Sequence, residues 1–218
     1  MTGAPDNSLF LEFKRKSIHL LALIIPFGLY FFPVKTALIL LFSVTAAFLA
    51  VETLRLRFIP ANTLFLKCFS SLMRSREQRM FTGATTLLIS ASFCTLIMLS
   101  FQKELLLPRE SRAALFYAFS FLILGDSAAA IFGKLYGKQK LFGEKTVIGS
   151  LACLLTGLFI YAAAEVPLDS GVTLPAALLT AFLTALLEAL PLKFDDNLFV
   201  PPVTCLTLFL IQKMDAFG

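Results

Sequence analysis

Charged residues and tryptophan are scarce in this chain of 218 residues. Only 15% of its residues are charged and it has no tryptophan, whereas soluble domains carry about 25% charged residues. Hydrophobic residues make up 58% of the chain. This balance excludes an ordinary soluble domain and indicates a membrane protein. The length favours one membrane domain spanning residues 1–218.

Several catalytic and metal-binding motifs are also missing. The segment 143–146 (Gly-Glu-Lys-Thr) comes nearest to a phosphate-binding P-loop, but its glycine spacing is wrong. The chain has no kinase glycine-rich loop, HExxH or GxSxG. The four cysteines lack metal-ligand spacing, so we interpret them as small packing residues. A nucleotide would therefore need a membrane-embedded site of another design.

Long apolar runs dominate what remains. Each is roughly 17–22 residues long, close to the length that spans a hydrocarbon core of ~30 Å. The runs cover residues 17–33, 35–54, 82–101, 112–133, 146–164, 172–191 and 198–214. An amphipathic stretch over 60–74, which Asn62 can cap, predicts an interfacial helix between the second and third spans. We therefore expect an all-α, multi-pass integral membrane protein with about seven transmembrane helices.

The basic residues predict an orientation. If the N-terminus is cytoplasmic, fourteen of the 19 lysines and arginines lie inside, in agreement with the positive-inside rule. The five outside are Lys35, Lys103, Arg109, Arg112 and Lys213. We expect a bacterial inner membrane or an endoplasmic-reticulum-type membrane, with the site loops cytoplasmic. Nucleic acid is a poor partner for such a chain, because no soluble basic domain exists to bind it.

Two predicted inner clusters precede the third span. Arg15, Lys16 and His19 stand at the mouth of the first span, and Arg15 and His19 are one helical turn apart. They would face a common site or serve only as a topology anchor. The second cluster, 74–85, combines arginines with Gly83 at the start of a span, where backbone or ligand can approach closely. Its alternative interpretation is a solvated charge run.

The third cluster is the segment 125–150, which begins with an acid directly after an apolar run. An ionisable group inside a membrane segment is costly, so Asp126 is a functional candidate. Gly125, Ala129 and Gly133 lie near one helix face, where another helix or a phosphate can come close. A packing seam of small residues is the alternative, but it leaves the acid unexplained.

The fourth cluster combines Glu188 with the run Asp195, Asp196 and Asn197. Carboxylate and amide oxygens are hard ligands that suit Mg²⁺. Such a run is also common in turns and helix caps. Glu188 lies near the inner end of its span, which makes it a candidate base or a supporting group.

In this order, the motifs resemble the signature of the polyprenol kinase family, which includes dolichol kinase, phytol kinase and CTP-dependent diacylglycerol kinase. The resemblance extends from about residue 12 to 205. It rests on Arg15-Lys16 with His19, Glu77 to Thr85, Gly125 to Gly133, Lys145 to Ser150, and Asp195 to Pro201. Part of it is similar to phosphatidate cytidylyltransferase, whose C-terminal signature is not found here.

The resemblance implies a membrane kinase that transfers a phosphoryl group, typically from CTP with Mg²⁺, to a lipid alcohol such as a polyprenol, a phytol-like isoprenoid or diacylglycerol. Asp126 or Glu188 would be the catalytic base. The metal ligands would be Asp126, Asp195, Asp196 and Asn197. The nucleotide would be bound by Arg15, Lys16, Gly133, Lys140, Lys145, Thr146, Gly149 and Ser150.

Two alternatives remain open. A cytidylyltransferase would use the same nucleotide and metal but would attack the α-phosphate. A non-enzymatic transporter fits less well, because the carboxylates cluster at one face and no inverted repeat is visible. The lipid, the base selectivity and the oligomeric state are not determined by these motifs.

Overall fold

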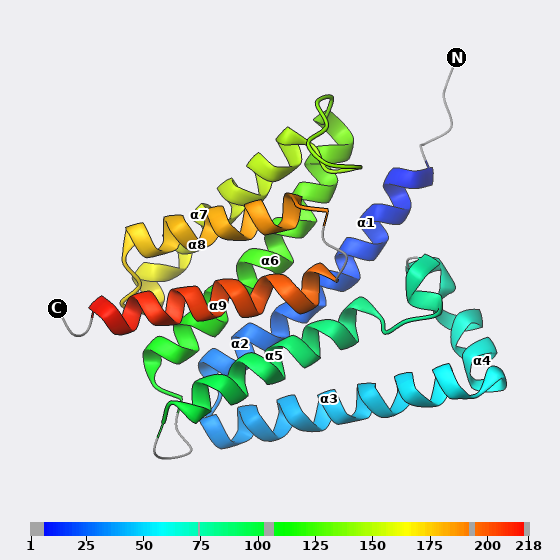
Figure 1. The fold of residues 1–218 in the computed structure, drawn as a ribbon, viewed down its shortest axis with the longest axis horizontal. Coiled ribbons are helices and arrows are strands. Elements are labelled where there is room, and N and C mark those ends of the chain that lie inside the picture. The colour runs from blue at the N-terminus through cyan, green and yellow to red at the C-terminus, as the bar shows by residue number, and fades with distance from the viewer. Residues whose placement is uncertain (1–6, 74, 103–106, 192–194, 216–218) are drawn as a thin grey trace.

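The computed structural model describes residues 7–73, 75–102, 107–191 and 195–215. Its regular structure is helical, with no strand in these ranges apart from a single bridge between Lys140 and Thr146. This confirms the all-α prediction. The elements are α1 (Asn7–Leu20), η1 (Leu21–Leu23), α2 (Ile24–Phe31), α3 (Val34–Arg57), α4 (Ile59–Phe69), η2 (Ser70–Leu72), η3 (Ser75–Gln78), α5 (Gly83–Ser100), α6 (Arg109–Tyr136), α7 (Val147–Leu168), α8 (Leu174–Ala189) and α9 (Asp196–Asp215), where η marks a 3₁₀-helix (Figure 1).

Five of the described helices are long and apolar enough to cross a membrane: α3, α5, α6, α7 and α9. The sixth predicted run forms α8, which is apolar but only 16 residues long. The first predicted run is divided among α1, η1 and α2, because a 3₁₀ turn interrupts the helix at Leu21–Leu23. The helices agree with a multi-pass membrane protein, and the count of seven crossings stays a prediction.

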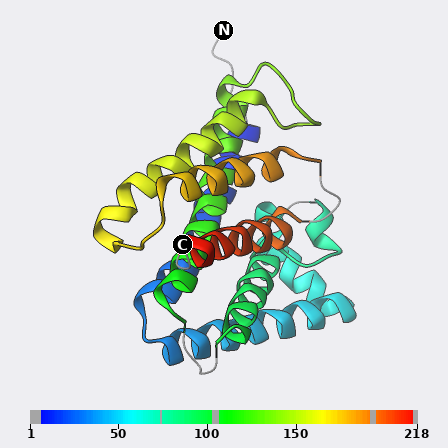
Figure 2. The same ribbon diagram turned by 60° about the vertical axis from the view of Figure 1, so that its left-hand side comes forward.

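Helix α6 occupies the centre of the bundle. It contacts α1, α2, α7, α8 and α9, and these helices surround it in both ribbon views (Figure 2). Every residue from Ala113 to Ile123 is buried. A helix that is apolar on all sides belongs in the interior, and this position places Asp126, one turn further on, inside the molecule.

The predicted interfacial helix is present as α4, followed by the 3₁₀ turn η2. The prediction that Asn62 caps it is wrong. Phe58 occupies the N-cap position and Pro60 lies in the first turn, where the fixed φ of proline favours helix initiation. The N-cap therefore lies four residues before Asn62, and Asn62 lies inside the helix.

A buried ion pair connects α3 to the segment before α5. Glu52 and Arg55 are each only 2% exposed, and the Arg55 Nε donates to Glu52 Oε2 at 2.7 Å. The same guanidinium donates to the carbonyl oxygens of Glu77 (2.9 Å) and Met80 (2.5 Å). Glu52 Oε1 accepts from the backbone N–H of Thr82 at 3.0 Å. These contacts fix the path of residues 77–82 against α3.

The described loops lie at two opposite ends of the bundle (Figure 1). The start of α1, the α3–α4 turn, the α6–α7 loop and the start of α9 share one end. The α2–α3 turn, the start of α6 and the α7–α8 turn share the other. This division matches the grouping of loops predicted from the basic residues. Arg74, Lys103 and Lys193 of that prediction lie outside the described residues.

We expect cysteines placed at Lys138 and Thr173 to react from opposite sides of the membrane. Both positions are exposed, one on the α6–α7 loop and the other before α8. The measurement is labelling by a membrane-impermeant maleimide in inverted and right-side-out vesicles, with the four native cysteines replaced. Labelling of both cysteines from one side would contradict the arrangement.

Arg55→Met should strongly destabilise the protein. The substitution leaves Glu52 buried without its cation, and breaking a buried pair in this way costs about 3–5 kcal/mol. Thermal unfolding in detergent should show a clear drop in the midpoint. Arg57→Met is the matched control, since Arg57 lies on the same helix but is exposed. Equal midpoints for the two variants would contradict this account.

Candidate active site

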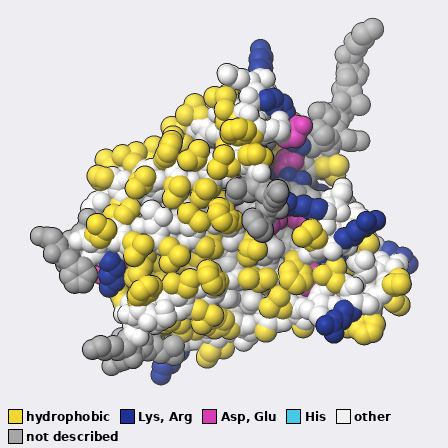
Figure 3. Space-filling view, viewed as in Figure 1, with side chains coloured by type: hydrophobic (Ala, Val, Ile, Leu, Met, Phe, Trp, Pro, Cys, Tyr) yellow, Lys and Arg dark blue, Asp and Glu magenta, His cyan; other side chains and the backbone are white. Residues whose placement is uncertain are grey.

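A cavity of about 640 Å³ opens between α1, α3, α4 and α5 and reaches the ends of α6 and α9. Its volume is within the ~300–1,000 Å³ typical of small-molecule sites. Its charged and amide lining residues are Arg15, Lys16, His19, Glu52, Glu77, Asp126, Asp195, Asp196 and Asn197. Figure 3 shows acidic and basic side chains gathered together on one part of a surface that is otherwise largely hydrophobic.

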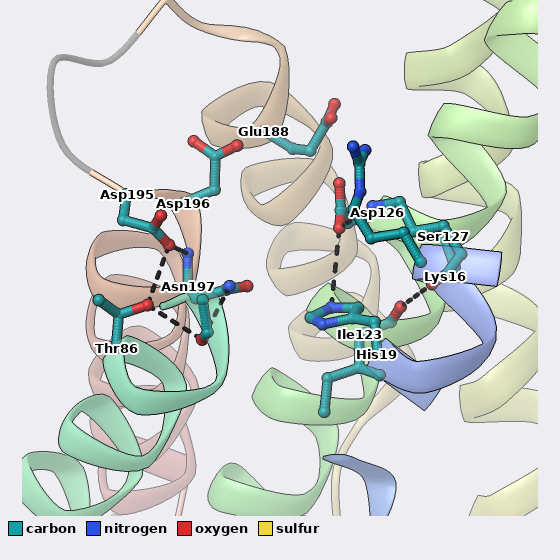
Figure 4. Close-up of polar contacts among 12 residues, drawn as sticks. Lys16, His19, Thr86, Ile123, Asp126, Ser127, Glu188, Asp195, Asp196 and Asn197 are labelled. Atoms are coloured by element: carbon teal, nitrogen blue, oxygen red, sulfur yellow. Dashed lines mark hydrogen bonds and ion pairs between the residues drawn. The ribbon is translucent and has the colours of Figure 1, made fainter. Parts of the chain in front are cut away.

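Lys16, His19 and Asp126 form the first centre of the cavity. The Lys16 ammonium donates to Asp126 Oδ2, and both residues are buried. His19 Nε2 lies 3.7 Å from the same carboxylate oxygen, as the dashed line in Figure 4 shows. Lys16 and His19 are three residues apart on α1 and share a face. The structure thus brings the first and third predicted clusters together.

Arg15 lines the same cavity but is paired within α1, where its guanidinium contacts Glu12. Glu12 is 6% exposed and also lies 2.9 Å from the Lys134 ammonium. Burial alone would raise the pKa of Glu12, but the hydrogen bond from Lys134 and the Arg15 charge lower it overall. The sequence analysis missed Glu12, although an acid three residues before an arginine is a recognisable helical pair.

Asp195 and Asn197 form a second centre with the start of α5. Asp195 Oδ2 accepts from Arg76 Nη2 at 2.6 Å, and its Oδ1 accepts from Thr86 Oγ1 at 3.2 Å. The Asn197 amide Nδ2 donates to the Gly83 carbonyl at 3.1 Å. The second and fourth predicted clusters therefore also meet. Asp195 Oδ1 accepts from the Asn197 N–H at 3.0 Å, so Asp195 caps α9, as the alternative interpretation expected.

Lys145, Glu188 and Asp196 form a third centre beside the cavity. The Lys145 ammonium contacts Glu188 and lies 3.6 Å from Asp196 Oδ2. Desolvation alone would lower the pKa of Lys145, but the charges of Glu188 and Asp196 raise it above its usual value. Of the three, only Asp196 lines the cavity. Figure 4 shows Glu188 and Asp196 beside each other, with Asp126 on a neighbouring helix.

The predicted magnesium ligands Asp126, Asp195, Asp196 and Asn197 all line one cavity. Among the described residues, no three acidic, histidine or cysteine side chains are grouped closely enough to hold a metal ion. Mg²⁺ usually binds through one or two carboxylates together with substrate phosphates. The lining carboxylates would suit a metal that arrives with a polyphosphate, and the ligand set stays a prediction.

Gly133, Thr146 and Gly149 meet where α6 packs on α7. A Cβ at Gly133 would lie 2.9 Å from Thr146 Oγ1, and one at Gly149 would lie 2.9 Å from the Ala129 carbonyl oxygen. Thr146 Oγ1 accepts from the Gly149 N–H at 3.1 Å and so caps α7. Small residues let two helix backbones approach closely. These residues do not line the cavity, and their predicted nucleotide contacts stay a prediction.

Two other predicted nucleotide residues lie apart from the cavity. Lys140 is exposed and pairs with Glu144 at 2.8 Å on the α6–α7 loop. Ser150 follows in the first turn of α7. Neither residue lines the cavity. The structure therefore separates the cavity residues Arg15 and Lys16 from the α6–α7 loop residues of the same predicted nucleotide set.

Comparison with known proteins relates part of the chain to a phytol kinase. The chain is 35% identical over 97 residues to the protein named "Probable phytol kinase 1, chloroplastic" of Glycine max, covering 39% of this chain and 32% of the plant protein. It is 26% identical over 198 residues to an uncharacterized protein of Rickettsia prowazekii, covering 90% and 92% of the two chains. No protein-family model and no solved structure matches the chain.

Gly125→Ala should destabilise the α6–α7 contact. A Cβ at this position would lie 2.6 Å from the Cys153 Sγ, and its next contact, the Cys153 carbonyl oxygen, is an ordinary 3.5 Å. Overpacking of this kind costs about 1–3 kcal/mol. Cys153→Ala should recover most of the loss when the two substitutions are combined, as measured by thermal unfolding in detergent. A double variant no more stable than Gly125→Ala alone would contradict the packing role.

Proposed function

We propose that this protein is a membrane lipid kinase that transfers the γ-phosphoryl group of a nucleoside triphosphate, with CTP as the first donor to test, to the hydroxyl of a lipid alcohol. One observation carries the proposal: a cavity with apolar walls on α1, α3 and α4 ends in the buried centre of Lys16, His19 and Asp126. The partial similarity to a phytol kinase supports the same class of reaction.

Phosphoryl transfer requires little covalent chemistry from the protein. The transition state is stabilised mainly by positioning and by positive charge on the phosphate oxygens. Lys16 lies in the cavity and Lys145 lies beside it, so both are placed to bind phosphates. Each lysine ammonium is already paired with a carboxylate in a partly desolvated site. A contact to phosphate is stronger in such a site than at an exposed surface.

Asp126 is the best candidate to receive the proton of the acceptor hydroxyl. Its carboxylate lies at the charged end of the cavity, beside His19 and Lys16, and a loose transition state needs only weak help from a base. Glu188 is less suited as the base, because it is buried against Lys145 and does not line the cavity. We assign Glu188 the role of orienting Lys145.

A magnesium ion bound here would supply positive charge that offsets the negative charge of the phosphate groups. Asp196 is the lining carboxylate we propose to hold it, because Asp126 is assigned to the proton and Asp195 already caps α9 and pairs with Arg76. One or two protein carboxylates are sufficient for a metal carried by a polyphosphate. Removal of divalent cations with a chelator should therefore abolish turnover without unfolding the protein.

The test uses purified full-length protein in lipid nanodiscs with Mg²⁺ and CTP labelled on either the α- or the γ-phosphate. Phytol, a polyprenol and diacylglycerol serve as acceptors. The proposal expects γ-label in the lipid and release of CDP. Pyrophosphate release with phosphatidate as acceptor would instead indicate a cytidylyltransferase. If neither label reaches any lipid, with ATP and GTP also tried, the kinase assignment is wrong.

Asp126→Asn should lower turnover by at least about a hundredfold, the lower range of general acid–base effects. Asparagine keeps the size of the side chain and removes its charge. Because Lys16 would then be buried without its partner, the double variant Lys16→Gln/Asp126→Asn is needed to restore stability. Asp169→Asn is the matched control, since that aspartate lies in the α7–α8 turn at the opposite end and pairs with Arg109. Near-normal turnover by a stable double variant would overturn the role of Asp126.

A further inference from the structure

The wall of the cavity opposite the charged end is apolar, and most of it comes from α1 with η1, from α3, and from α4 with the turn after it. Ile18 and Ala22 contribute from α1 and η1, and Ala47, Phe48 and Val51 contribute from α3. Phe65, Phe69, Leu72 and Met73 complete it from α4 and the turn after it. None of these side chains is buried, so the apolar wall belongs to an open cavity and not to the packed core.

The cavity extends from the charged end toward the middle of the bundle. Ala22 is six residues beyond Lys16, and Ala47 is five residues before Glu52 on α3, which runs the opposite way. At 1.5 Å per residue, both alanines lie about 8 Å deeper than the charged residues of their helices. Because α3 is long and apolar enough to cross a membrane, the wall at that depth would face hydrocarbon, where only an apolar ligand can be accommodated without loss of hydration.

The helices on the two sides of this opening pack on different partners. Helix α1 packs against α6, whereas α3 packs against α5 and α4. Ile18 and Phe48, which line the cavity from the two sides, are 45% and 41% exposed. Two small side chains, Ala22 and Ala47, line the deep part of the same opening. An apolar chain that entered between Ile18 and Phe48 would reach the cavity without crossing the charged end.

We infer that the cavity between α1 and α3 is the binding site of an apolar chain that ends in a hydroxyl, that this chain enters sideways from the bilayer, and that Ala47 limits the width of the passage. The reaction of the bound chain rests on the proposed function, whereas the binding of the chain does not. The hydroxyl end would lie beside Lys16, His19 and Asp126. Diacylglycerol and an isoprenoid alcohol share this chemistry, and the experiment separates them.

A binding test does not depend on turnover. The full-length protein in nanodiscs is exposed to a long-chain primary alcohol carrying a diazirine in the middle of its alkyl chain, irradiated and mapped by peptide mass spectrometry. We expect label in 47–51 or 65–73, reduced by an excess of unlabelled phytol or of diacylglycerol according to which lipid the site accepts. Label spread over the outward residues Leu21, Ile24 and Phe159, with no reduction by either competitor, would overturn the inference.

Ala47→Phe should lower cavity labelling by about tenfold, equivalent to about 1.4 kcal/mol, because added bulk would fill the passage. Ala46→Phe is the matched control: it makes the same change one residue away, at an exposed position that does not line the cavity. Equal labelling of the two variants would overturn the role of Ala47.

The two hypotheses fail in different ways. If a competitor reduces the labelling but the protein transfers phosphate from no nucleotide, the lipid-binding site is supported and the proposed function is wrong. If the protein is an active kinase, Ala47→Phe should raise KM for the long-chain acceptor by about tenfold, the same change in free energy, and leave KM for CTP unchanged. Kinase activity with an unchanged acceptor KM would overturn the inference alone.

Discussion

The ion pair between Lys16 and Asp126 is the contact on which the site depends. Both residues are buried, and a charge inside a membrane protein must be paired or face a polar cavity. The pair joins α1 to the central helix α6 and places His19 within 3.7 Å of the same carboxylate. Without it, α1 would be held to Asp126 by the longer His19 contact, and the charged end of the cavity would lose one side.

The same constraint recurs elsewhere in the described chain. Glu52 and Arg55 pair within α3 and together bind the segment before α5, and Lys145 pairs with Glu188 between the α6–α7 loop and α8. Each pair joins elements that the loops alone would leave free to shift. Because the pairs involving lysine lie in or beside the cavity, an arriving polyphosphate would compete with the carboxylates for the same cations. Under the proposed function, these lysines would exchange their carboxylate partners for phosphate.

Much of this arrangement could be predicted from the sequence, because membrane helices are long and their composition is distinctive. The one-sided distribution of charge indicated which loops would meet, and Asp126 was recognisable as an acid within an apolar run.

Other features depend on packing that has no local pattern. Arg55 was predicted only as one of several basic residues at the inner side. Glu52 was not predicted, although it is an acid within the apolar run 35–54 and the reasoning applied to Asp126 would have identified it. Asn62 was misplaced because Pro60 and Phe58 determine the start of α4. The separation of Lys140, Gly133 and Gly149 from the cavity follows from how α6 and α7 pack, which the order of motifs does not reveal.

The small residues of α6 and its acid do not compete as explanations of the same segment. Consecutive residues of a helix point about 100° apart, since a turn contains 3.6 residues. Gly125 can therefore face Cys153 of α7 while Asp126 faces Lys16 of α1. The close approach at Gly125, and again at Gly133 and Gly149, fixes the rotation of α6 about its axis. That rotation determines the direction of the carboxylate. The close packing of α6 on α7 is therefore a structural condition for the charged centre. A side chain added at one of these glycines would change the orientation of Asp126 at the site.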